Sequence, residues 1–302
     1  MKRLRTSMLS LAVALGGLTV SSGAMAQATW NLYSGSGNGC SQNATNSGDY
    51  GNSWNCTGSS GVTATASAWS QDRGTSGQVD GGFLSAPGSG SYYASAYLSP
   101  QGSSGFGAAS RSEGIGATAP NHAFDSVAPG TQDLLLLNFG SASVILNSIG
   151  IGWNGTNDSD ITLLRWSGST APGQVTTSSP RTTDGQQNLI ATGWTLVNSY
   201  SNLVADSSMP FGDTAVNTGA TQASSWWLIS TFNSALNGGT SCKTPTGTTT
   251  CDNSNDAFKL NFISATVVPP PPGKVPEPGS LALAGLALAG LFGVRRSTKT
   301  QV

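Results

Sequence analysis

The chain has 302 residues, of which 40 are glycine and 9% are charged, against a usual charged share of about 25%. Eight Trp, nine Phe and six Tyr supply apolar material for a core. They exclude a wholly disordered chain, because disordered chains are poor in aromatic residues. Residues 27–268 carry thirteen Asp or Glu and six Lys or Arg, a formal charge of −7, without a basic cluster. This acidity argues against nucleic acid or an anionic lipid surface as a partner.

The N-terminus has the three parts of a secretory signal peptide. A basic start at residues 2–5 precedes an apolar stretch from 8 to about 20, which is shorter than the ~20 residues of a membrane-spanning helix. Ala24 and Ala26 supply the small residues of a cleavage site, and cleavage after Ala26 makes Gln27 the first mature residue. We therefore expect export and removal of this segment.

Four cysteines fall into two local pairs, Cys40 with Cys56 and Cys242 with Cys251. No C-x-x-C spacing occurs and the chain has a single histidine, so a zinc site is not expected. In an exported protein, two disulfides that close local loops are the expected use of these residues. The sequence leaves pairing between the two distant groups open.

The region between the two ends is a succession of short alternating segments separated by Gly, Ser, Asn and Pro, which predicts antiparallel β-structure. We expect an all-β domain over residues 27–268, built as a β-sandwich or jelly roll of nine or ten strands. Residues 100–130 show no clear pattern and are expected to form a long excursion. The predicted strands lie at 28–34, 62–70, 91–99, 133–139, 142–153, 160–166, 188–199, 224–232 and 257–267.

Two of these strands allow a prediction for individual side chains. In the last strand, Phe258, Leu260 and Phe262 alternate with polar residues and are expected on one buried face. In the strand at 224–232, the adjacent Trp226 and Trp227 must face opposite sides of the sheet. Either that strand is covered on both sides or one of its tryptophans is exposed.

The motifs that carry catalytic chemistry are weak. Glycines at 150, 152 and 155 match the G-x-G-x-x-G pattern, but a turn and a strand follow where dinucleotide binding needs a helix. His122 is the only imidazole, close to Asp125, and no G-x-S-x-G elbow occurs. We expect no catalytic residue, no cofactor and no enzyme activity.

Two acidic segments contain the oxygen ligands that Ca²⁺ prefers, at 157–160 and 252–256. The second segment begins like an EF-hand loop, but Ala257 stands at the glycine position and Ile263 at the glutamate position. Because Asn and Asp are also common in surface turns for backbone reasons, we expect no metal. Calcium remains the alternative for these two segments.

The C-terminal part changes character after residue 268. A proline run predicts a stiff polyproline II linker, and the ten residues 269–278 would span about 30 Å at ~3.1 Å per residue. The apolar run 281–294 follows, and as a helix it would reach about 21 Å, short of the ~30 Å hydrocarbon core. Such a segment suits a temporary anchor, with Arg295 and Arg296 on the cytoplasmic side.

This C-terminus resembles the PEP-CTERM sorting signal of exosortase substrates in Gram-negative bacteria. The resemblance rests on an ordered set of elements: Val275, Pro276, Glu277 and Pro278, then the apolar run, then Arg295 and Arg296. It implies export, transient anchoring in the inner membrane and cleavage near Pro-Glu-Pro by exosortase, a membrane enzyme. It also implies a destination at the cell surface or in an extracellular matrix associated with exopolysaccharide or biofilm.

The resulting organisation is a signal peptide (1–26), a secreted β-domain (27–268), a Pro-rich linker (269–274) and a sorting signal (275–302). The leading functional hypothesis is a surface or matrix structural protein without catalytic activity. The first alternative is a carbohydrate-binding module that uses exposed Trp or Tyr rings, because apolar sugar faces stack on aromatic rings. A less favoured alternative is a secreted enzyme that acts on polysaccharides.

Overall fold

A computed structural model describes residues 25–33, 39–46, 49–71, 93–111, 113–115, 122–126, 132–172, 193–205, 213–234, 239–244, 247–252 and 256–269. The rest of the signal-peptide region, nearly all of the proline linker and the whole sorting segment lie outside this range. The described part is nearly all β-structure, as the sequence predicted, with two short 3-10 turns, η1 (Ala44–Asn46) and η2 (Gly102–Ser104).

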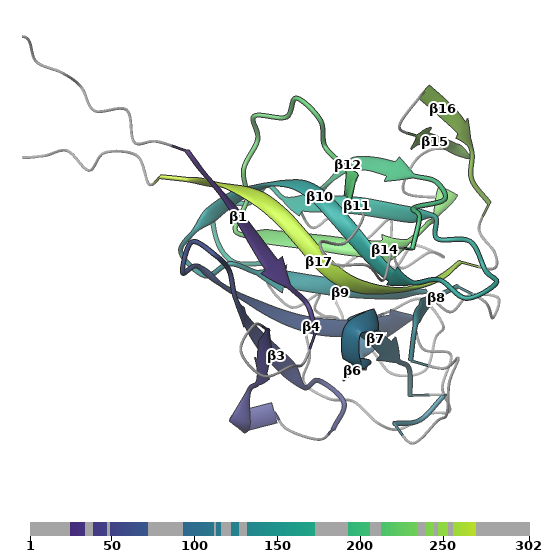
Figure 1. Cartoon of the computed structure of the whole chain (residues 1–302), viewed down its shortest axis with the longest axis horizontal. Coiled ribbons are helices and arrows are strands. Elements are labelled where there is room, and N and C mark those ends of the chain that lie inside the picture. Colours follow the sequence, from purple (N-terminus) through teal and green to yellow (C-terminus); the bar gives the residue numbers. More distant parts are fainter. Residues whose placement is uncertain are drawn as a thin grey trace, which may run out of the picture.

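The described strands form two sheets (Figure 1). The smaller sheet has the order β13-β10-β17-β7-β6, and β1 and β8 also pair with β17. Its strands are β1 (Ala26–Asn31), β6 (Tyr97–Pro100), β7 (Phe106–Ala109), β8 (Phe124–Asp125), β10 (Ser143–Trp153), β13 (Asp213–Ala215) and β17 (Ala257–Val268).

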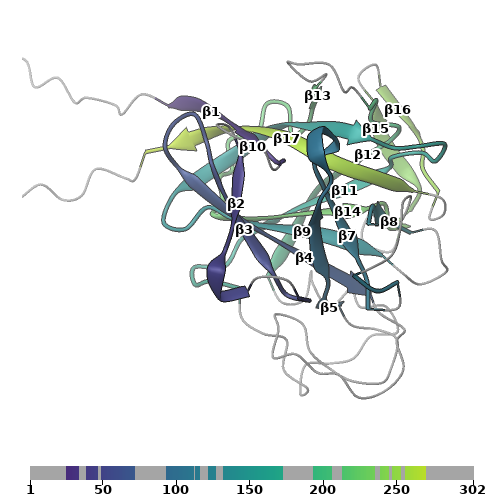
Figure 2. The same cartoon turned by 60° about the horizontal axis from the view of Figure 1, so that its bottom comes forward.

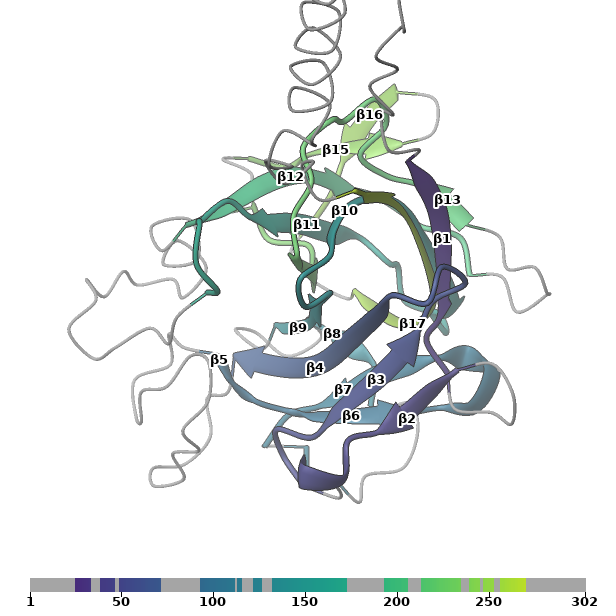
Figure 3. The same cartoon turned by 90° about the vertical axis from the view of Figure 1, so that its left-hand side faces the viewer.

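The larger sheet has the order β16-β15-β12-β11-β14-β9-β4-β3-β2, and β5 also pairs with β4. Figure 3 shows the β15–β16 and β2–β3 pairs at the two ends of this sheet. Its strands are β2 (Cys40–Gln42), β3 (Ser53–Thr57), β4 (Thr63–Gln71), β5 (Tyr93–Ser95), β9 (Asp133–Asn138), β11 (Ile161–Trp166), β12 (Trp194–Tyr200), β14 (Trp226–Thr231), β15 (Ser241–Thr244) and β16 (Gly247–Thr250).

The main core lies between the two sheets. In Figure 2, β1, β17 and β10 run above β9, β14 and β4. The smaller sheet contributes Trp30 and Ile263, and the larger sheet contributes Leu135 and Trp227, all buried in one cluster. Residues that alternate with these along each strand face away from the core.

A second apolar cluster covers part of the outer face of the larger sheet. Leu134 and Leu136 of β9 belong to this outer cluster, whereas Leu135 and Leu137 point into the main core. The uninterrupted leucine run is therefore explained by burial on both faces of the strand. The same holds for β14, where Trp227 is buried in the main core and Trp226 is half-buried against the outer cluster. Of the two alternatives for this strand, apolar packing on both sides is the one observed.

The predicted face of β17 is correct for its first half and wrong for its second half. Phe258 and Leu260 are buried in the core, but Phe262 is partly exposed and Ile263 takes the next inward position. The pairing of β10 with β17 shifts between Leu260 and Phe262, which marks a β-bulge. An extra residue in one strand reverses the alternation beyond it, so Phe262 turns outward.

Two glycines of the G-x-G-x-x-G pattern, Gly150 and Gly152, lie beside this bulge. A Cβ atom on Gly150 would lie 2.9 Å from the side-chain oxygen of Asn261. On Gly152 it would lie 2.5 Å from the carbonyl oxygen of Ser104. These glycines therefore allow close packing of β10 against β17 and η2. The strand continues into a turn and β11, as expected for a chance match to the fingerprint.

The sequence prediction missed the shorter strands. Residues 100–130 contain β7 and β8 rather than one long excursion, and the described strands number seventeen rather than nine or ten. The strands that the prediction missed have only two to five residues each. One of them, β7, pairs with β17 through the single pair Phe106–Leu260. Elements this short depend on their neighbours and show little pattern of their own.

Both local disulfides are present, and the alternative of pairing across the chain is not observed. Cys40 of β2 is bonded to Cys56 of β3, and Cys242 of β15 is bonded to Cys251 just after β16. Register explains the first pair, since Cys40 lies directly opposite Cys56 in the ladder. The second pair forms a small buried cluster with Phe232.

We expect the intact mass of the exported protein to rise by four hydrogens on reduction. Each bond should also stabilise the fold by roughly 2 to 3 kcal/mol, because each closes a short loop in the unfolded chain. Mass spectrometry with and without reductant tests the first point, and urea unfolding tests the second. Free thiols in the native exported protein would contradict both.

Candidate functional site

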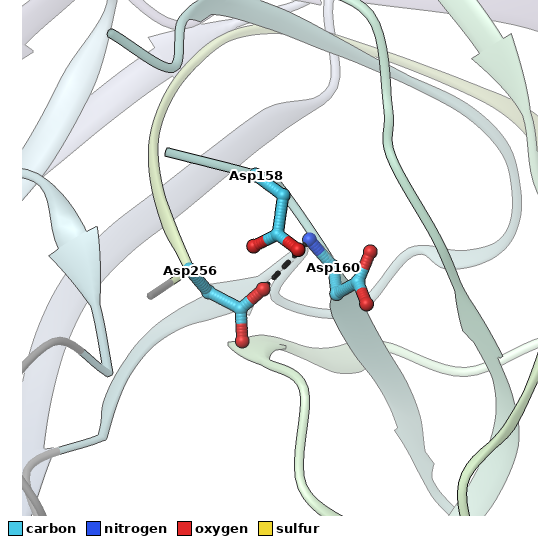
Figure 4. A group of neighbouring side chains, drawn as sticks. All are labelled: Asp158, Asp160 and Asp256. Atoms are coloured by element: carbon cyan, nitrogen blue, oxygen red, sulfur yellow. Dashed lines mark hydrogen bonds between the residues drawn. The ribbon is translucent and has the colours of Figure 1, made fainter. Parts of the chain in front are cut away.

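The two acidic segments of the sequence meet at one place in the fold. Asp158 and Asp160 belong to the connection between β10 and β11, and Asp256 directly precedes β17. A parallel bridge joins Asp158 to Asp256, and one carboxylate oxygen of each of the three residues lies within 4.8 Å of the others. In Figure 4 the carboxyl groups of Asp158 and Asp256 point toward each other, with that of Asp160 beside them. We call these three residues the Asp trio.

Hydrogen bonds orient the Asp trio. The Asp160 N–H donates to Asp256 Oδ1 at 3.0 Å, and the Ser126 hydroxyl donates to Asp256 Oδ2 at 3.1 Å. The Asn202 N–H donates to Asp160 Oδ1 at 2.7 Å. Asp158 Oδ1 is buried and has no hydrogen-bond partner within the described residues. Backbone and hydroxyl donors therefore hold Asp160 and Asp256 in place, whereas Asp158 Oδ1 has no donor among the described residues.

Burial makes the charged form of these carboxyl groups costly. Asp256 is fully buried and Asp160 is 2% exposed. Burial, then the hydrogen bond and charge of Asp158, raise the pKa of Asp256 to about 10. Burial is also the main cause that raises the pKa of Asp160 to about 6. None of the described Lys or Arg side chains forms an ion pair with the trio. Protonation of Asp256 is the simplest way to relieve the repulsion.

The same geometry has the oxygen ligands that a hard cation such as Ca²⁺ prefers. Sequence reasoning weighed the two acidic segments separately, and only the fold shows that they supply one group of ligands. It missed Ser126 and Asn202, which are far away in sequence and belong to common residue types. No pattern in the chain could have assigned them to this site.

Another buried carboxyl group, apart from the Asp trio, lies in the larger sheet. Asp133 at the start of β9 is 1% exposed, and its Oδ2 accepts a bond of 3.4 Å from the Asp125 N–H. Burial is the main cause of the raised pKa of Asp133, and the charges of Asp125 and Glu113 add to it. Asp125, which the sequence placed close to His122, thus contacts Asp133 through its backbone.

His122 contacts a buried serine. Its Nδ1 lies 3.1 Å from Ser99 Oγ, and both residues are buried. The Gln101 side-chain amide also donates to Ser99 Oγ, at 2.7 Å. Burial is the main cause that lowers the pKa of His122, and its Nε2 has no hydrogen-bond partner among the described residues. A catalytic histidine needs a group that orients its second nitrogen.

The signal-cleavage and sorting residues are only partly within the described range. Ala26 and Gln27 begin β1 and are exposed, whereas Ala24 and the sorting residues from 275 onward lie outside it. Within the described residues, no helix combines the length and apolar content needed to cross a membrane. The predicted apolar helix at 281–294 is not part of that range.

Comparison with known proteins gives one match, at the C-terminus. Residues 274–297 match the family model of the PEP-CTERM protein-sorting motif, which confirms the resemblance seen in the sequence. No curated protein and no solved structure matches the chain. The motif implies an exported protein that exosortase sorts and processes.

Proposed function

We propose, from the premise that the chain carries a PEP-CTERM sorting motif and is exported, that its β-domain is a structural component of the cell surface or of an extracellular matrix. The sorting motif carries this proposal. In this scheme, the C-terminal segment anchors the chain in the inner membrane until exosortase cuts near Pro276, Glu277 and Pro278. The freed domain then joins an exopolysaccharide or biofilm layer.

The positions of the two chain ends support a tethered arrangement. Ala26 at the start of β1 lies opposite Val267 near the end of β17, and both lie on the left of Figure 1. The start of β1 and the end of β17 therefore lie at the same edge of the described domain. A domain attached only at this edge would present its opposite end, with the Asp trio at the start of β17, away from the membrane.

We further propose that the domain has no catalytic activity. The support is the chemistry of the candidate sites. Ser99 and His122 are both buried, and the Asp trio holds two carboxyl groups that are closed off from solvent. Glycoside hydrolysis needs two carboxyl groups on either side of an accessible bond. An enzyme that hydrolyses polysaccharides would need a solvent-accessible cleft with two carboxyl groups on opposite sides of the bond.

Mass spectrometry of surface material from the native host tests the sorting role. We expect tryptic peptides from the β-domain and none from residue 281 onward, because the anchor is removed before release. Replacing Pro276, Glu277 and Pro278 by Ala should retain the intact chain in the membrane fraction. The matched control is Lys299→Ala, which lies beyond the matched residues 274–297 and should be processed normally. Recovery of an intact C-terminus in surface material would contradict the proposal.

A further inference from the structure

A groove of about 490 Å³ lies at one end of the larger sheet, where β9 and β11 end and β14 begins, and Ser143 of β10 also lines it. Its walls include Trp166 and Trp226, several serines and Arg165, the one charged residue among the described groove residues. Both tryptophans are half-buried and pack against the outer cluster. The groove therefore combines aromatic surface, hydroxyl groups and a single positive charge.

Strand register extends this groove into a row that crosses the sheet. Trp226 lies opposite Asn138, Asn138 opposite Thr65, Thr65 opposite Asn55, and Asn55 opposite Ser41. Trp166 lies one residue beyond the pair Arg165–Trp227 and so continues the row past Trp226. Arg165 lies opposite the core residue Trp227 and therefore on the other side of β11, and it meets the row only at the groove beside the strand ends. We call Trp166, Trp226, Asn138, Thr65, Asn55 and Ser41 the outer row.

The outer row faces away from the core. Thr65 alternates with Ala64 and Ala66, and Asn55 alternates with Trp54 and Cys56, all of which are buried in the core. The row thus runs on one side of six adjacent strands from β11 to β2. At ~4.8 Å between strands it extends over roughly 24 Å. That length suits a chain molecule lying across the strands better than a single small ligand.

Several side chains of the row are held in place while keeping donors for a ligand. Ser224 Oγ lies 2.8 Å from the main-chain carbonyl oxygen of Trp166 and 2.9 Å from that of Trp226, and its single proton can be donated to either, so it links the backbones of the two tryptophans. Asn138 Oδ1 accepts from the Gly140 N–H at 2.8 Å, and Asn55 Oδ1 accepts from the Thr65 hydroxyl at 2.9 Å.

The remaining donors of the row point to the chemistry of its ligand. The amide nitrogens of Asn138 and Asn55 and the indole nitrogen of Trp226 have no hydrogen-bond partner within the part of the chain that the structure describes. The Arg165 guanidinium is held by the Gln222 side chain and has no described acidic partner. Aromatic rings, amide donors and an arginine together match sugar rings, hydroxyl groups and a carboxylate.

We propose that the outer row and Arg165 bind an acidic saccharide chain, one that contains uronic acid residues. This inference rests on the proposed surface or matrix role and names its partner. The tryptophans contact sugar rings, the amides of Asn138 and Asn55 bind hydroxyl groups, and Arg165 pairs with a carboxylate. An arginine forms such pairs with two parallel hydrogen bonds, which gives preference over a neutral sugar.

Isothermal titration calorimetry on the full chain in detergent tests this proposal. The probes are a galacturonic acid oligosaccharide and a neutral glucose oligosaccharide of the same length. We expect the acidic probe to bind, and to bind at least about tenfold more tightly than the neutral one, since a hydrogen bond to a charged group contributes about 1.5 to 3 kcal/mol. Failure of the acidic probe to bind, or equal affinity for both probes, would overturn the proposal.

Variants locate the binding site. Trp226→Ala should weaken binding at least about threefold by loss of aromatic contact. Arg165→Gln should remove the preference for the acidic probe, and Asn138→Asp should weaken acidic binding by charge repulsion without removing a large side chain. The matched control is Trp153→Ala, a half-buried tryptophan of the smaller sheet.

Circular dichroism verifies that each variant is folded. Unchanged binding in both Arg165→Gln and Asn138→Asp would refute the site. The assay requires neither export nor processing, so its failure is distinct from failure of the sorting experiment.

Discussion

Replacing Ile263 by Ala should lower the free energy of unfolding by about 2 to 5 kcal/mol, whereas replacing the larger Phe262 by Ala should lower it by less than about 1 kcal/mol. Ile263 is fully buried in the main core, but Phe262 lies at the bulge of β17 and is partly exposed. The loss of a buried side chain leaves a cavity that the surrounding core fills only in part. Strict alternation along this strand predicts the opposite order of effects.

Urea unfolding of the two single variants measures this difference. Phe258→Ala serves as the control for a phenylalanine of the same strand that is fully buried, and it should cost about 3 to 5 kcal/mol. If the slope of the free energy of unfolding against urea concentration is unchanged, the variants alter stability rather than the unfolded state. If Phe262→Ala lowers the free energy of unfolding more than Ile263→Ala does, Phe262 faces the core and the proposed position of the bulge is wrong.

Replacing Asp256 by Asn should stabilise the fold at pH 8 and weaken its dependence on pH. The folded-state pKa of Asp256 is raised to about 10 and that of Asp160 to about 6, so the folded protein binds more protons than the unfolded chain between about pH 4 and these values. Stability therefore falls as pH rises through this window and increases on acidification from pH 8 to pH 5. Each such group contributes at most about 1.4 kcal/mol per pH unit.

The asparagine fits the bonds that Asp256 makes. Its oxygen can accept from the Asp160 N–H, and its amide can donate toward Ser126 and Asp158 without a proton from solvent. Thermal unfolding of the native chain and Asp256→Asn at pH 5 and pH 8 tests this. Asp49→Asn, an exposed residue between β2 and β3, is the matched control and should keep the pH dependence of the native chain. If added Ca²⁺ stabilises the native chain at pH 8 and removes its pH dependence, then a cation rather than a proton holds the Asp trio.

The match between predicted and observed strands is close wherever a strand is long. The prediction at 142–153 corresponds to β10, and the prediction at 160–166 corresponds to β11. Long strands carry enough alternating or doubly buried apolar residues to reveal their period. The two-residue β8 carries no such pattern, and its place depends on pairing with β17.

The candidate sites were less predictable than the strands. Asp158 and Asp256 lie 98 positions apart in the sequence, and their contact comes from the parallel bridge beside β17. The outer row likewise draws one residue from each of six strands. Register decides which side chains become neighbours across a sheet, and register follows from the packing of whole strands rather than from any local motif.

The sequence by itself determined the all-β class of this protein, its acidic character and the sorting motif at residues 274–297, because composition, alternation and ordered linear motifs are local properties. Only the tertiary structure decided that Phe262 turns outward, that the Asp trio assembles and that tryptophans and amides align in the outer row. Each of these depends on strand pairing over long sequence separations, where a shift of one residue moves a side chain to the other face.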